Sequence, residues 1–145
     1  MKELLRNKKA YYQYSVLEEY EGGIILTGNE VKSIRDGNIT ILDSFIYLKD
    51  NEVFIKNMII SQYKKVHPSS KHVENREKKI LLKKREISKI KKSLLIKGIT
   101  CIPLSFYNKN NKIKVNIGIC KGKKEFDKRE SIKKRDLDRE IKTYV

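Results

Sequence analysis

Short segments that alternate apolar and polar residues, with compact turn sequences between them, constrain the fold most strongly. Residues 44–49 and 52–56 alternate in this way on either side of Asp50-Asn51, which predicts a β-hairpin with a tight turn. Residues 99–107 and 113–120 predict two further strands joined by a turn at 109–112. Period-two alternation of this kind is typical of strands with one face on a core.

Other segments carry helix signals or punctuation. Residues 29–37 predict a short helix, with Asn29 as a cap and Gly37 at its end. Residues 76–98 have mostly helical apolar spacing and predict a helix broken once near Lys84. Residues 1–10 predict a basic arm, residues 11–17 predict a strand, and residues 19–23 are interpreted as an interruption of that strand.

Short strands with inserted helices predict a mainly β fold, an OB-fold-like antiparallel β-barrel plus a basic C-terminal tail. We place the barrel in residues 1–126 and the tail in residues 127–145. The main apolar anchors of the tail are Ile132, Leu137 and Ile141, too few for a core. An isolated helix of this length is marginal in water, so the tail is expected to become helical on binding.

The charge balance indicates a nucleic-acid partner. The chain has 34 Lys+Arg against 18 Asp+Glu, a formal net charge of +16, which favours polyanions. An anionic membrane is the weaker alternative, and part of the charge reflects a general richness in Lys, Ile and Asn. The sequence contains neither a signal-peptide pattern nor a membrane span, so a soluble cytoplasmic protein is expected.

Signals for catalysis are scarce. His67 and His72 have no metal-ligand spacing, and Cys101 and Cys120 lie in apolar stretches without a CxxC pair, which favours buried thiols over a disulfide or metal site. We therefore expect a non-enzymatic protein with no cofactor, metal or small-molecule substrate. The alternatives are a static ribosomal protein or general RNA chaperone, and a small nuclease.

Several motifs could contact RNA, and each has a plainer alternative. Glu21, beside Gly22-Gly23, could accept hydrogen bonds from a base or a ribose, or pair with a surface lysine. Lys32 and Arg35 could hold a phosphate or form a solvated helix face. Leu81 could pack on an unstacked base or belong to the core. Gly122, within the basic run Lys121–Lys124, predicts a hinge between body and tail.

In order along the chain, these motifs resemble those of the SsrA-binding protein family, SmpB. The resemblance runs from Asn7 to about Arg139, and the ordered set is far more specific than any one motif. It rests on Asn7–Ala10, Tyr20–Gly23, Gly28–Arg35, Asp43-Ser44, Arg76–Ile87, Gly98–Thr100, Pro103-Leu104, Lys112–Ile119, Lys121–Lys124 and Asp127–Arg129.

The resemblance implies an OB-like barrel that binds the tRNA-like domain of transfer-messenger RNA (tmRNA) and carries it to stalled 70S ribosomes in trans-translation. The tail is then expected to occupy the empty mRNA path, near the decoding region of 16S rRNA. RNA-contacting roles carry over to Asn7, Glu21, Leu81 and Lys114. Charge alone adds Lys32, Arg35, Arg76, Lys78 and Lys79. The decoding-region segment is Lys121, Gly122, Lys123, Lys124, Asp127, Lys128 and Arg129.

The sequence departs from the family pattern at a few positions. Phe126 stands where the family often has His or Tyr, so stacking is retained while a hydrogen bond from the ring is lost. Lys83 replaces a common His or Asn. Leu137 stands where an aromatic residue is frequent, which bears on the anchoring of the tail more than on RNA binding.

Overall fold

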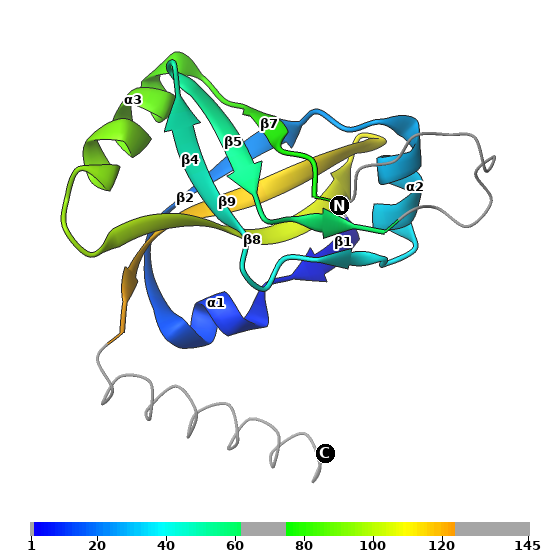
Figure 1. The fold of residues 1–145 in the computed structure, drawn as a ribbon, viewed down its shortest axis with the longest axis horizontal. Helices are drawn as coiled ribbons and strands as arrows, with labels where there is room; N and C mark the ends of the chain where they lie inside the picture. Colours follow the sequence, from blue (N-terminus) through cyan, green and yellow to red (C-terminus); the bar gives the residue numbers. More distant parts are fainter. Residues whose placement is uncertain (1, 62–74, 124–145) are drawn as a thin grey trace, which may run out of the picture.

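The computed structural model describes residues 2–61 and 75–123 of the chain. Figure 1 shows a strongly curved sheet with α3 (Lys84–Leu94) at one end and α2 (Gly28–Arg35) at the other. Strands β4 (Phe45–Lys49), β5 (Glu52–Lys56), β7 (Lys78–Leu81), β2 (Tyr14–Ile24), β9 (Lys112–Gly122) and β8 (Ile99–Lys109) follow one another around this sheet.

The strand pairings form a closed circuit. Every pairing is antiparallel, and β8 pairs with β4 through Cys101 as well as with β9 along its length. The C-terminal half of β8 also pairs with β1 (Lys2–Arg6). Strands β4 and β1 therefore lie one after the other along the same edge of β8. The observed architecture is the expected OB-like antiparallel fold, in which pairing around a circuit leaves few free edges.

Both predicted hairpins are confirmed. Asp50 and Asn51 have φ of 52° and 61° between β4 and β5, and Asn110 and Asn111 have φ of 53° and 62° between β8 and β9. Positive φ at both central residues is the geometry of a type I′ turn, which matches the right-handed twist of paired strands. Asn and Asp tolerate this conformation better than most residues.

The predicted helix at 29–37 is confirmed as α2, with a different cap. The Thr27 hydroxyl accepts a hydrogen bond from the Glu30 backbone N–H at 3.2 Å, and the Glu30 carboxylate accepts one from the Thr27 N–H at 2.8 Å. This reciprocal pair is a capping box. Gly37 follows the helix with a φ of 78°, as the prediction of a glycine stop requires.

Four predictions of secondary structure were wrong. Residues 1–10 are not a free arm, because β1 pairs with β8 and α1 (Lys8–Gln13) follows it. The strand expected over residues 11–17 begins only at Tyr14, because residues 11–13 belong to α1. Residues 19–23 do not interrupt β2, and residues 78–81 form β7 rather than a helix. The glycines explain both of the latter results, because a Cβ on Gly22 would lie 2.7 Å from Ile80 Cγ2. The bare backbone of β2 thus lets β7 approach closely.

The core fills the space enclosed by the strands. Val53, Ile55, Phe106, Val115 and Ile117 are fully buried there. Cys101 and Cys120 are also buried and unpaired with each other, which confirms the expectation of structural thiols. Burial is the main cause that raises the pKa of both thiols, that of Cys120 to about 11. In the described part of the chain, no helix is long and apolar enough to cross a membrane.

Candidate RNA interface

The glycine pair of β2 forms the centre of the first candidate surface. Gly23 lies opposite Lys114 of β9 on one side and Leu81 of β7 on the other. A Cβ on Gly23 would lie 3.8 Å from both Leu81 Cδ1 and Lys114 Nζ. The absence of a side chain at Gly23 therefore leaves an exposed leucine and an ammonium group side by side.

A shallow pocket of about 340 Å³ adjoins this point. It is lined by Leu81, Lys114 and Arg35 together with residues of β2, α2 and the β8–β9 turn. Leu81 is 52% exposed, so the sequence-based alternative of a core residue is wrong. The pocket combines an apolar side chain with two cations, a composition that suits an unstacked base and its phosphates. We call Glu21, Leu81, Lys114 and Arg35 the glycine-centred surface.

Glu21 lies on the same strand, two residues before Gly23. Its carboxylate accepts a hydrogen bond from the Tyr107 hydroxyl at 2.6 Å and forms an ion pair with the Lys109 ammonium at 3.1 Å. The Tyr107 hydrogen bond is the main cause that lowers the pKa of Glu21 below its ordinary value. The lysine pairing expected as the plainer alternative is thus present, while the carboxylate stays 40% exposed and able to accept further hydrogen bonds.

Two of the predicted cations, Arg76 and Lys78, lie in an ionic cluster around Glu30 of α2. Arg76 donates to Glu30 Oε1 at 2.5 Å, and Lys78 Nζ lies 4.0 Å from Glu30 Oε2. Lys78 is fully buried and donates to the Met58 carbonyl at 3.1 Å. Lys79 instead pairs with Glu52 at 2.9 Å on the surface. The structure therefore gives Lys78 a structural role, without the surface position that phosphate binding requires.

Burial and hydrogen bonds act against each other in this cluster. Burial works to raise the pKa of Glu30, yet hydrogen bonds from Arg76 and from the Thr27 backbone lower it overall. Burial lowers the pKa of Lys78 to about 8, because a buried ammonium loses hydration. Lys32, on the same helix as Glu30, is exposed. It does not line the pocket at the glycine-centred surface.

Asn7 has a structural role that sequence reasoning missed. Its side chain accepts a hydrogen bond from the Ala10 N–H at 3.2 Å and donates to the Pro103 carbonyl at 2.9 Å. It is 7% exposed and caps α1. Asn preceding a short helix is a known capping signal and could have indicated this role.

The basic hinge begins at the other end of the molecule from α2. Lys121 and Gly122 end β9, opposite Ser15 and Tyr14 of β2. The Lys123 N–H donates to the Gln13 carbonyl at 3.0 Å, and its ammonium donates to the Tyr11 carbonyl at 3.2 Å. The start of the hinge is therefore fixed to α1. Lys124, Phe126, Asp127, Lys128, Arg129 and Leu137 lie outside the described residues, as do His67 and His72.

Comparison with known proteins settles the family. The family model described as SmpB protein matches residues 4–145. The chain belongs to the SmpB family. It is 50% identical to the SsrA-binding protein of Treponema denticola, over 100% of this chain and 94% of that protein. It is 47% identical to the SsrA-binding protein of Persephonella marina, over 97% and 92% of the two chains.

A solved structure supports the fold. A chain from the structure "tmRNA-SmpB: a journey to the center of the bacterial ribosome" matches with a TM-score of 0.69 and 35% identity. The match covers 88% of this chain and 93% of that one. SmpB membership and the OB-like architecture are thus shown independently, by sequence and by structure.

Proposed function

We propose that this SmpB-family chain is an RNA-binding adaptor that binds the tRNA-like domain of tmRNA and delivers it to stalled ribosomes in trans-translation. The observation that carries the proposal is the family match over residues 4–145, joined to the meeting of Leu81, Lys114 and Arg35 at one pocket. Relatives along nearly the whole chain are named for SsrA binding.

The glycine-centred surface supports specific recognition in addition to charge attraction. A carboxylate among cations weakens nonspecific attraction to phosphates, so Glu21 contributes most by accepting hydrogen bonds from a base or a ribose. Leu81 offers an apolar contact to an unstacked base, and Lys114 and Arg35 reach phosphates. Asn7 contributes by building the end of the barrel that holds α1, and Lys32, Arg76 and Lys79 add to the cationic field.

The division of labour between body and tail is part of the same proposal. The body, residues 1–126, binds RNA, while residues 127–145 enter the empty mRNA path, with Lys121–Lys124 and Asp127–Arg129 near the decoding region of 16S rRNA. The anchoring of Lys123 to α1 supports this arrangement, because it gives the segment a fixed point of departure from the barrel.

A matched pair of leucine variants tests the body's role. Leu81 is 52% exposed on β7, and Leu17 is 54% exposed on β2 outside the pocket. Leu81→Ala is expected to weaken binding to the tRNA-like domain roughly tenfold, or about 1.4 kcal/mol, as for loss of part of a buried apolar contact. Leu17→Ala should leave the affinity unchanged. Equal affinities for both variants in a filter-binding assay would oppose the assignment.

A further inference from the structure

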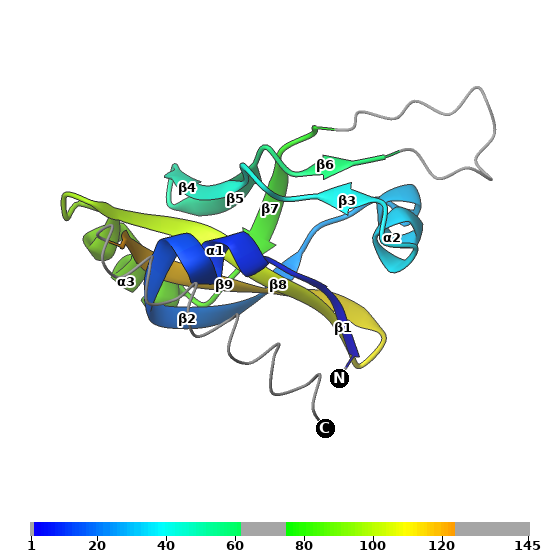
Figure 2. The ribbon, with the colours of Figure 1, turned by 90° about the horizontal axis from the view of Figure 1, so that it is seen from below.

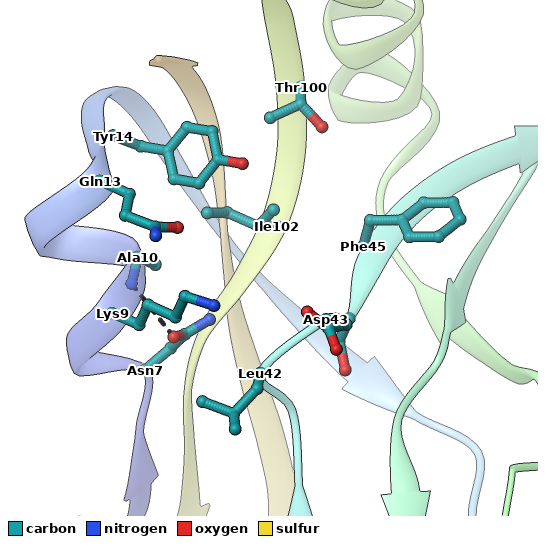
Figure 3. Close-up of a pocket in the computed structure, with 11 residues that line it drawn as sticks. Asn7, Lys9, Ala10, Gln13, Tyr14, Leu42, Asp43, Phe45, Thr100 and Ile102 are labelled. Atoms are coloured by element: carbon teal, nitrogen blue, oxygen red, sulfur yellow. Dashed lines mark hydrogen bonds between the residues drawn. The ribbon is translucent and has the colours of Figure 1, made fainter. Parts of the chain in front are cut away.

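A second pocket lies at the end of the barrel from which the hinge departs, away from the glycine-centred surface. Its volume is about 340 Å³. Figure 3 shows that α1 and the start of β2 form one wall, with Lys9, Gln13 and Tyr14, and that Leu42, Asp43 and Phe45 form the other. Thr100 and Ile102 of β8 lie between the two walls. We call this site the α1 pocket.

The walls of the α1 pocket are fixed by the fold. The two hydrogen bonds of the Asn7 side chain hold the start of α1 against β8. On the facing wall, the Ser44 hydroxyl donates to the Asn57 carbonyl at 3.0 Å, and the Ser44 N–H donates to the Ile41 carbonyl at 3.1 Å. Asn7 and Ser44 are both buried. The pocket is therefore largely preformed, as small-ligand sites usually are.

The lining combines an aromatic ring with polar groups of both kinds. Tyr14 supplies a ring for stacking, Asp43 supplies a carboxylate that accepts hydrogen bonds, and Lys9 supplies an ammonium that donates. Gln13 and Thr100 both donate and accept. A planar ring with a hydrogen-bonding edge matches this set, and a nucleobase is the common planar group of that kind in RNA. The volume is near the lower end of the range for ligand pockets, roughly 300–1,000 Å³, which suits one base.

The position of the pocket indicates which RNA supplies the base. Gln13 and Tyr14 line the pocket and also contact the hinge, since Gln13 accepts from the Lys123 N–H and Tyr14 pairs with Gly122. Figures 1 and 2 both place α1 and the end of β9 away from α2. The proposed function puts the hinge near the decoding region. The α1 pocket, which lies beside the hinge, would then face ribosomal RNA.

We propose that the α1 pocket binds one unpaired nucleobase of ribosomal RNA, with Tyr14 stacking on the base and Asp43 accepting hydrogen bonds from its amino or imino edge. The proposal rests on the proposed function, since it requires the chain to act on the ribosome. Guanine fits best, because its N1–H and N2–H₂ groups present adjacent donors that one carboxylate can accept together.

The test compares Asp43→Asn with Asp50→Asn. Both remove one exposed negative charge, and Asn tolerates the positive φ at position 50. Affinities are measured for tmRNA-bound protein on ribosomes stalled without a codon, and for the isolated tRNA-like domain. Asp43→Asn should weaken ribosome binding about tenfold, as expected for loss of a good base contact. Its affinity for the tRNA-like domain should match that of Asp50→Asn.

A cross-link identifies the occupant. Leu42 lines the pocket and is 61% exposed, so a photoreactive benzoylphenylalanine at this position should couple to a ribosomal RNA nucleotide. Coupling to a ribosomal protein or to tmRNA, or equal ribosome affinity of the two Asp variants, would overturn the proposal. Failure of the unmodified protein to prefer the tRNA-like domain would instead refute the proposed function, so the two failures are distinguishable.

Discussion

Tyr107 of β8 donates a hydrogen bond of 2.6 Å across the sheet to Glu21 of β2. The two residues are 86 positions apart in sequence, and β9 lies between their strands. Burial and this hydrogen bond raise the pKa of Tyr107 above its ordinary value, so the phenol stays protonated and able to donate well into the alkaline range. The tyrosine thus fixes the direction of the one carboxylate in the glycine-centred surface.

Glu21→Ala is expected to weaken binding to the tRNA-like domain without unfolding the protein. The side chain is 40% exposed, and its removal leaves Tyr107 with one partner fewer. Affinity at matched salt and thermal unfolding are the two measurements. Tyr107→Phe serves as a positioning control, because it keeps the carboxylate and removes only the hydrogen bond that directs it. It should lower the affinity less than Glu21→Ala, and an affinity of Glu21→Ala equal to that of the unmodified protein would exclude the role.

Gly22→Ala is expected to destabilise the fold and displace Leu81. The added Cβ would lie 2.7 Å from Ile80 Cγ2 and 3.1 Å from the Leu81 carbonyl, so β7 would have to move. Overpacking of this kind typically costs about 1–3 kcal/mol. Gly28→Ala is the control, because nothing lies within 4 Å of a Cβ at the start of α2. Denaturant unfolding should separate the two variants, and similar midpoints would disprove the close approach of β7.

Burial of Lys78 is expected to make the free energy of unfolding depend on pH in the alkaline range. The pKa of Lys78 is lowered from 10.5 to about 8 in the folded chain, so between these values the unfolded chain binds the extra proton. The free energy of unfolding therefore rises with pH across this interval, by at most about 1.4 kcal/mol per pH unit. Lys78→Met, which keeps an unbranched buried side chain, should remove the rise. Parallel pH profiles for the two proteins would show that Lys78 is not the source.

Glu30→Gln is expected to destabilise the protein substantially. The carboxylate is 2% exposed, and it holds Arg76 as well as lying near Lys78. Loss of one member of a buried pair costs roughly 3–5 kcal/mol, and the partial exposure of Arg76 favours the lower end of that range. Glu52→Gln, which affects only the exposed pair with Lys79, should change the unfolding free energy by less than about 1 kcal/mol. Equal effects would contradict the structural role of the cluster.

Deletion of residues 131–145 separates the two halves of the proposed function. The deletion should preserve affinity for the tRNA-like domain and abolish peptide tagging on stalled ribosomes, because the proposed function has the tail act only after delivery. Binding and tagging are measured on the same preparation. Parallel loss of both would contradict the division between body and tail.

Local signals in the sequence were sufficient for the hairpins and α2. Asp50-Asn51 and Asn110-Asn111 specify turns directly between the strands they join. The local sequence therefore holds all the information needed to predict these hairpins. Strand β7 was mistaken for a helix because Ile80 and Leu81 continue the spacing of α3. Its strand conformation depends on pairing with β2 and β5, which are distant in sequence.

The roles of exposed residues in the candidate site could be predicted from the sequence more readily than the roles of residues that the fold buries. The pattern alone left Leu81 either in the core or at the surface, and only the resemblance to the family pointed to RNA contact. Lys78 was grouped with surface cations, because a buried lysine has no signal of its own in a basic run. The cap that Asn7 provides to α1 is local, whereas its hydrogen bond to the Pro103 carbonyl joins residues 96 positions apart and has no local signal.

The most direct test of the proposed function is competition binding across a salt series. Purified protein is bound to the tmRNA tRNA-like domain, with an ordinary tRNA and an unrelated hairpin as competitors. Attraction to phosphates weakens steeply with salt for every RNA, whereas hydrogen bonds and apolar contacts to bases persist. A preference for the tRNA-like domain is expected to remain at high salt. Loss of all three RNAs together would contradict it and leave only a general basic surface.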